Sequence, residues 1–102
     1  MGIASINPST GETLKSFEEL GPDQINEKLQ RASDTFRTYR LTSFESRAAM
    51  MTQAAELLES EKYELGQIMT LEMGKPLKAA ISEAEKCAWV CRYYSETTAK
   101  HL

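Results

Sequence analysis

Two cysteines and one histidine are the side chains of this chain with the most distinctive chemistry. Cys87 and Cys91 lie four residues apart in a segment with helical periodicity, so they share one helix face. A reactive cysteine needs a nearby base or a helix N-terminus that lowers the pKa of its thiol. Because these two lie in mid-helix among apolar residues, we expect small buried core residues and not catalytic nucleophiles.

A metal site is the alternative reading of the same side chains. Cys87, Cys91 and His101 would need further ligands and a closed geometry to hold a metal ion. The only histidine lies near the last residue of the chain, where helices fray. We therefore expect no metal site, and two cysteines are too few for a disulfide scaffold.

The acidic residues offer a second kind of chemistry. Glu83, Glu85 and Glu96 are separate positions on a solvated helix, and nothing pairs them as acid and base across a cleft. Glu72 and Lys75 stand on either side of Gly74, where a helix is expected to end. We interpret them as a polar helix end, with Lys75 near the C-terminal carbonyls.

The elements that position these residues begin with a short β-hairpin over about residues 3–17. Asn7 precedes Pro8, which moves its backbone out of the helical region. Gly11 suits the end of the turn, because glycine adopts positive φ at little cost. A lone hairpin is marginal in water, so this one needs a surface on which to lie.

Three helical segments are predicted next, over about residues 22–38, 43–73 and 76–100. The first begins with Pro22, which suits the first helical position, and its apolar residues recur at spacings of four, three and four. This apolar stripe consists of Ile25, Leu29, Ala32 and Phe36. The fold class is therefore mainly α with a short N-terminal β-hairpin.

The second helical segment starts where Thr42 and Glu45 have the spacing of a capping box. Residues 60–62 either bend this helix or restart it, and Gly74 followed by Pro76 ends it. Its apolar face is expected to hold Phe44, Ala48, Met51, Ala55 and Leu58.

The last helix is expected to carry Pro76 in its first turn. Its apolar residues cover more than one side, and a small standalone domain would rarely expose Trp89 and Val90. The chain stops within a turn of this helix without a helix-stopping residue, which we interpret as an interruption. The expected core positions are Leu77, Ile81, Ala84, Cys87 or Ala88, Cys91, and Tyr94 or Ser95.

Bulk composition excludes several classes of function. A net charge of −3 gives no electrostatic footprint for nucleic acid. No apolar run approaches the roughly 20 residues that span a bilayer, so no membrane partner is expected. The absence of a signal-peptide pattern favours a cytoplasmic protein. The glycines are scattered singly, so no glycine-rich phosphate-binding turn is present.

Four segments resemble the aldehyde dehydrogenase superfamily. Residues 6–12, INPSTGE, are similar to the NP-x-TGE hairpin near the start of these enzymes, and residues 42–47, TSFESR, resemble a helix start of the family. Residues 69–77, MTLEMGKPL, and residues 83–96, EAEKCAWVCRYYSE, look like a block of succinate-semialdehyde dehydrogenases. The order and spacing resemble the family over essentially the whole chain.

This resemblance implies that residues 1–102 are the leading part of an α/β coenzyme-binding domain. The whole enzyme would oxidise a short-chain semialdehyde, succinate semialdehyde above all, with NAD or NADP, and the family is homo-oligomeric. Its catalytic cysteine, general-base glutamate, oxyanion-binding asparagine and nucleotide crevice would lie downstream. No catalytic or cofactor-binding residue is then expected here, and the chain alone would take no cofactor. Some family members hold a structural monovalent cation near the acidic position that corresponds to Glu72.

Two hypotheses follow for the 102-residue chain. In the first, it is an inactive scaffold whose partner is the remainder of an aldehyde dehydrogenase, with residues 92–94 in packing and subunit contacts. In the second, it is a standalone helical interaction module or the remnant of a truncated gene. Under both, uncovered apolar helix faces are expected to drive self-association.

Overall fold

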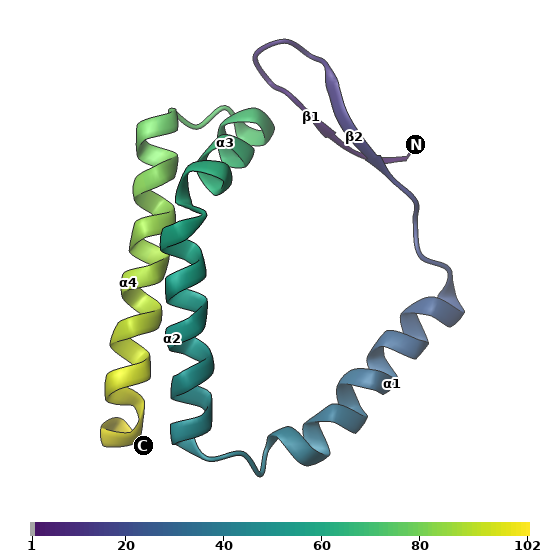
Figure 1. Ribbon diagram of the computed structural model, residues 1–102. Helices are drawn as coiled ribbons and strands as arrows, with labels where there is room; N and C mark the ends of the chain where they lie inside the picture. Colours follow the sequence, from purple (N-terminus) through teal and green to yellow (C-terminus); the bar gives the residue numbers. More distant parts are fainter. Residues whose placement is uncertain (1) are drawn as a thin grey trace.

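The computed structural model describes residues 2–102 and confirms a mainly helical chain with an N-terminal β-hairpin. Figure 1 shows the hairpin at one end of a helical pair, with one helix set apart on the other side. In chain order the elements are β1 (Ile3–Ile6), β2 (Thr13–Phe17), α1 (Pro22–Tyr39), α2 (Phe44–Ser60), α3 (Lys62–Met73) and α4 (Leu77–His101).

The hairpin pairs β1 and β2 in antiparallel fashion, with Ile3 opposite Phe17. Asn7 closes the turn, because its carbonyl oxygen accepts a hydrogen bond from the backbone N of Gly11 at 2.8 Å. Gly11 has a φ of 75°, so it occupies the left-handed region as predicted.

Helix α1 begins as the sequence predicts, with Pro22 in its first position. The backbone N of Gly21 donates a hydrogen bond to Oε1 of Gln24 at 2.9 Å, which closes the N-terminal turn. Asp23 in this turn adds a negative charge at the positive end of the helix dipole.

The start of α2 differs from the predicted capping box of Thr42 and Glu45, and that prediction is wrong. Ser43 is the N-cap, and its hydroxyl accepts a hydrogen bond from the backbone N of Ser46 at 3.1 Å. The Thr42 hydroxyl instead donates to the carbonyl of Tyr39 at 2.7 Å. A threonine next to a helix end has this local carbonyl as a competing partner, and here that partner is preferred.

The helical stretch expected over residues 43–73 is two helices. Glu61 separates α2 from α3 with φ −104° and ψ 10°, so the helix restarts at this residue. Gly74 ends α3 in the left-handed conformation, and its N–H donates to the carbonyl of Thr70 at 3.0 Å. The ring of Pro8 packs close to Gly74, which brings the hairpin to this end of α3.

Helix α4 begins one residue later than expected. Pro76 has a ψ of 133° and is therefore the residue before the helix, not part of its first turn. Its carbonyl nevertheless accepts the first hydrogen bond of the helix, from the backbone N of Ala80 at 2.9 Å.

The core is a strip of alanines between α4 and the helices α2 and α3. The α2–α4 contact is the most extensive between two helices, and these helices run antiparallel side by side (Figure 1). Small side chains allow two helices to approach closely. The buried residues of this strip are Ala55 on α2 and Ala80, Ala84 and Ala88 on α4, each at most 1% exposed.

The prediction that both cysteines are buried is wrong in this chain. Cys87 is exposed and Cys91 is half-buried, while Ala88 takes the buried position. Residues three and four positions after Ala84 continue the stripe equally well in sequence. In the packing of α4 against α2, the buried position is Ala88, four residues after Ala84. The two cysteines lie beside the alanine strip.

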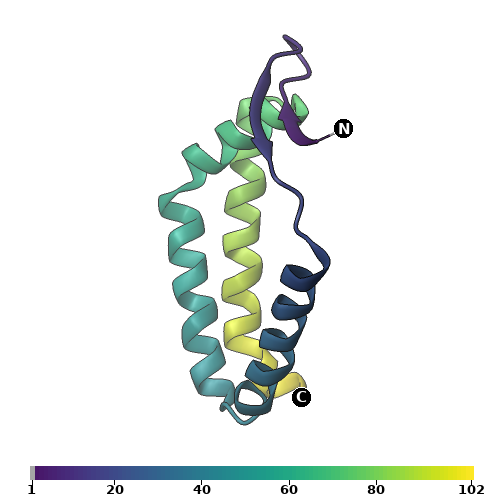
Figure 2. The ribbon, with the colours of Figure 1, turned by 90° about the vertical axis from the view of Figure 1, so that its right-hand side faces the viewer.

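The whole molecule is open. Its accessible surface is 8296 Å², whereas a compact chain of 11.5 kDa has roughly 5,800 Å². Its radius of gyration is 17.9 Å, against roughly 13 Å for a compact domain of this length. Figure 2 shows α1 as a separate rod beside the helical pair. No helix within residues 2–102 is both long and apolar enough to cross a membrane.

Candidate functional site

The residues with distinctive chemistry do not come together. Cys87 and His101 are on the same helix, about 21 Å apart along its axis at 1.5 Å per residue. Within residues 2–102, no three His, Cys, Asp or Glu side chains lie close enough to hold a metal ion. Both thiols are free, and each lies more than two turns from the N-terminus of α4, the position at which this helix would activate a thiol.

The two charged residues that flank the end of α3, Glu72 and Lys75, have different surroundings. Nζ of Lys75 lies 3.7 Å from Oε1 of Glu83 on α4, so this lysine spans the turn between the two helices. Glu72 lies exposed in the last turn of α3, where the structure places no basic residue in the same turn.

The acidic residues of α4 and α2 hold helices together. Oε1 of Glu85 lies 2.9 Å from Nζ of Lys62 on α3, and Oε2 of Glu59 lies 2.9 Å from Nη2 of Arg92 on α4. The hydrogen bond to Glu85 and its negative charge raise the pKa of Lys62 above its ordinary value. These carboxylates are engaged in ion pairs between helices and do not face one another across a cleft.

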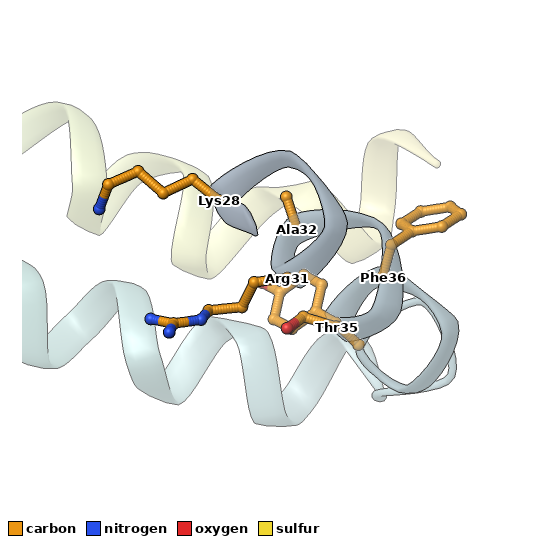
Figure 3. Close-up of a pocket in the computed structure, with 6 residues that line it drawn as sticks. Lys28, Arg31, Ala32, Thr35 and Phe36 are labelled. Carbon is orange, nitrogen blue, oxygen red and sulfur yellow. The ribbon is translucent and has the colours of Figure 1, made fainter. Parts of the chain in front are cut away.

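The apolar stripe of α1 is the first of the uncovered surfaces. Its members lie on one side of the helix as predicted, yet Ile25 is 46%, Leu29 63% and Phe36 61% exposed. In Figure 3, Lys28 and Arg31 extend in one direction along α1, and Phe36 lies at the other end. A shallow depression of about 460 Å³ lies on the second half of α1 and shares Ala32 and Phe36 with this stripe. Its other lining residues are Lys28, Arg31, Thr35 and Tyr39.

A second surface is the groove between the start of α2 and the end of α4. The groove encloses about 500 Å³, and its walls are mainly apolar and aromatic side chains. Arg47 lies at its α2 edge and is half-buried. The residues that line it include Tyr39, Phe44, Ala48, Met51, Tyr94, Thr98 and Leu102.

A third surface is the outer face of α4. Trp89 is 65% exposed, and its ring centroid lies 6.3 Å from that of Tyr93. Tyr93 in turn packs edge-on against Tyr94, with centroids 5.2 Å apart. Large aromatic side chains on a protein surface are typical of contacts with another chain or domain.

These three surfaces expose apolar and aromatic side chains and are suited to contact with another chain or domain. The sequence pattern identified the stripe of α1 and the wide apolar face of α4, but it missed the groove and the position of Arg47 at its edge. The groove joins residues about 50 positions apart in the chain, and periodicity within one helix carries no signal for such a neighbourhood.

Residues 1–102 match the sequence model described as the aldehyde dehydrogenase family. The chain belongs to the aldehyde dehydrogenase family. The uncovered helix faces are therefore surfaces of an aldehyde dehydrogenase segment, and the resemblance to this family is confirmed over residues 1–102.

Curated relatives of this aldehyde dehydrogenase segment are roughly four and a half times as long as this chain. A probable NADP(+) succinate-semialdehyde dehydrogenase from Synechocystis is 41% identical over 102 residues, which are all of this chain and 22% of that protein. The NADP(+) succinate-semialdehyde dehydrogenase 1 of Mycobacterium tuberculosis is 49% identical over 96 residues, or 94% of this chain and 21% of that protein. The chain thus spans about a fifth of the length of the curated relatives it matches.

Solved aldehyde dehydrogenase structures contain the same arrangement of elements. Succinic semialdehyde dehydrogenase from Streptococcus pyogenes, in complex with NADP+, gives a TM-score of 0.89 at 28% identity, over 95% of this chain and 22% of that chain. NADP-dependent glyceraldehyde-3-phosphate dehydrogenase from Bacillus halodurans gives a TM-score of 0.88 at 27% identity, over 94% and 20%. The open arrangement of hairpin, α1 and helical pair is therefore a family feature.

Proposed function

We propose that this chain is the N-terminal scaffold segment of an NAD(P)-dependent aldehyde dehydrogenase, and that it is inactive alone. The whole enzyme would oxidise a short-chain semialdehyde, with succinate semialdehyde as the best supported substrate, to the carboxylic acid. The observation that carries the proposal is the apolar stripe of α1, which is complete but uncovered by any other described element. Such a stripe on a helix is normally buried against a domain core.

The substrate and cofactor parts of the proposal rest on relatives. Proteins that are 41–49% identical to this chain are named as NADP(+) succinate-semialdehyde dehydrogenases, which favours NADP over NAD. Cofactor binding would fall to the remainder of the enzyme, since no glycine-rich turn lies in this chain. Homo-oligomerisation and a cytoplasmic location complete the proposal. The two free thiols favour a reducing compartment.

A helical interaction module is the second candidate function. The observation in its favour is that α4 packs on α2 and α3 along a buried alanine strip, and that two ion pairs link those helices to α4. In this case the outer face of α4, with Trp89 and Tyr93, would bind a partner chain instead of the remainder of the same enzyme.

Fragment complementation distinguishes the two candidates. This chain is co-expressed with the Mycobacterium tuberculosis relative from which the matching segment has been deleted, and NADP+ reduction with succinate semialdehyde is measured. We expect turnover from the mixture and none from either part, because the missing scaffold is restored. Turnover by this chain alone would contradict the scaffold proposal, and failure to restore activity would favour the interaction module.

A matched pair of variants tests which surface is used. Phe36→Asp places a charge on the apolar stripe of α1, so we expect it to abolish the restored turnover. Asn26→Asp places the same charge on the outward face of the same helix and is expected to leave turnover within about twofold.

A further inference from the structure

Helix α1 has no packing that accounts for its orientation. Within residues 2–102, neither the hairpin nor the helical pair packs extensively against it. Only residues 40–43 join α1 to α2, and a four-residue link leaves many angles open between two helices. Whatever holds the angle of α1 must therefore act at this junction.

The carbonyl oxygen of Tyr39, at the end of α1, collects three hydrogen bonds. The backbone N of Thr42 donates at 3.0 Å and the Thr42 hydroxyl at 2.7 Å. Nη2 of Arg47, from the first turn of α2, donates the third at 3.0 Å. One terminal carbonyl of α1 is thus bonded both to the link and to the next helix.

Arg47 holds this junction through three separate contacts. Besides its bond to Tyr39, its Nε donates to the Thr42 hydroxyl at 2.8 Å. Its guanidinium carbon also lies 4.9 Å from the centroid of the Tyr39 ring, in the range of a cation–π contact. A planar guanidinium that donates along two directions and stacks on a ring fixes orientation as well as distance.

The charge of Arg47 is placed where it is favourable. The C-terminal end of a helix carries partial negative charge on its unsatisfied carbonyls. Arg47 is half-buried beside this end of α1, so water screens the attraction less than at an exposed site. No other contact between α1 and α2 combines hydrogen bonding, stacking and charge in the described residues.

We propose that Arg47 is a clasp that sets the angle between α1 and α2. The clasp presents the apolar stripe of α1 in one orientation before any other chain or domain covers it. This proposal does not depend on which aldehyde the whole enzyme oxidises, and it stands if the complementation experiment fails.

Distances between spin labels test the clasp in this 102-residue chain. One nitroxide is attached at Asn26→Cys on α1 and one at Glu96→Cys on α4, with Cys87→Ala and Cys91→Ala removing the native thiols. A control pair replaces the first label with Gln53→Cys on α2. Labelled chain is diluted with unlabelled chain, so that only distances within one molecule are measured.

We expect one narrow distance distribution for the α1–α4 pair of labels. In Arg47→Ala this distribution should become at least twofold broader, and the distribution of the control pair should stay unchanged. Arg47→Lys keeps the charge but loses the planar guanidinium that donates along two directions, so it should also broaden the α1–α4 distribution. Thr42→Val should broaden the distribution because it removes the shared hydroxyl. Arg31→Ala, on the exposed face of α1, should leave the width of this distribution unchanged.

Three results would overturn the proposal. One is an α1–α4 distribution that is already broad in the unsubstituted chain, and another is the same width with and without Arg47. The third is equal broadening of the control pair in Arg47→Ala. In that case Arg47 would stabilise the helical pair in general and would not set the junction.

Discussion

At Gly66, helix α3 approaches α4 so closely that no side chain fits between them. A Cβ on this residue would lie 2.7 Å from Cγ1 of Ile81 and 3.2 Å from its backbone N. The side-chain atom could move, but the backbone atom could not move without shifting α4. Gly66 is buried, and its lack of a side chain sets the crossing of these two helices.

Gly66→Ala is therefore expected to destabilise the chain. Overpacking costs about 1–3 kcal/mol, whereas the helix propensity of alanine returns about 1 kcal/mol. A net loss of about 1 kcal/mol should appear in urea unfolding, and Ile81→Ala in addition should recover part of the clash. Gln67→Ala, exposed and one residue later, is the control. An unchanged or raised midpoint for Gly66→Ala would contradict the close approach.

Glu72 has a carboxylate at the negative end of α3, which is unfavourable for the helix. If it is only a polar helix end, Glu72→Gln should raise the free energy of unfolding by about 0.3 kcal/mol. The effect should be the same in potassium, sodium and large organic cations. A loss of stability seen only with a small monovalent cation would instead support a cation-binding role.

At the scale of elements, ion pairs tie the ends of α2 and α3 to α4. Lys62 and Glu85 join α3 to α4, and Glu59 and Arg92 join α2 to α4. Their side chains are partly exposed, so each pair contributes modestly. The alanine strip supplies the close packing between these helices.

The Lys62–Glu85 pair makes a prediction about pH. Because the pKa of Lys62 is raised in the fold, the ion pair contributes fully to the free energy of unfolding below a pH of about 10. This contribution is lost as the pH rises through the raised pKa of Lys62. Lys62→Met should lower the melting temperature slightly at pH 7, and the difference from the parent chain should shrink toward pH 12. A difference that is constant with pH would contradict this.

Lys28→Met is the matched control for the pH series. Lys28 lies exposed on α1 and forms no ion pair within residues 2–102. Lys28→Met should therefore have the same melting temperature as the parent chain at every pH.

At the scale of the whole molecule, the surface is about 1.4 times that of a compact chain of this mass. Several of the largest apolar side chains contribute to that excess, and none of the large side chains of residues 2–102 is fully buried. Association with another surface is the direct way to remove such area from water.

We expect the chain to self-associate at micromolar concentration. Light scattering should give a mass above 11.5 kDa that rises with concentration. Leu29→Glu on the apolar stripe of α1 should lower that mass, whereas Asn26→Glu, an exposed position outside the stripe, should not. A monodisperse monomer with a cooperative thermal transition would contradict the prediction and indicate an independently stable helical domain.

The sequence alone determined where the elements lie. Pro22 begins a helix, Gly74 ends one and Gly11 closes a turn, because the allowed φ values of proline and glycine act within a few residues. Regular spacing likewise identified the stripe of α1 without any knowledge of its surroundings. These are local effects, and a local pattern suffices to predict them.

Only the tertiary structure decided how the elements meet. The pattern admitted Cys87 or Ala88 in the core, and packing against α2 chose Ala88. The same holds for Gly66 against Ile81 and for the clasp of Arg47 on Tyr39. These contacts depend on atoms that approach only when whole helices are placed, and periodicity within one helix contains no information about that placement.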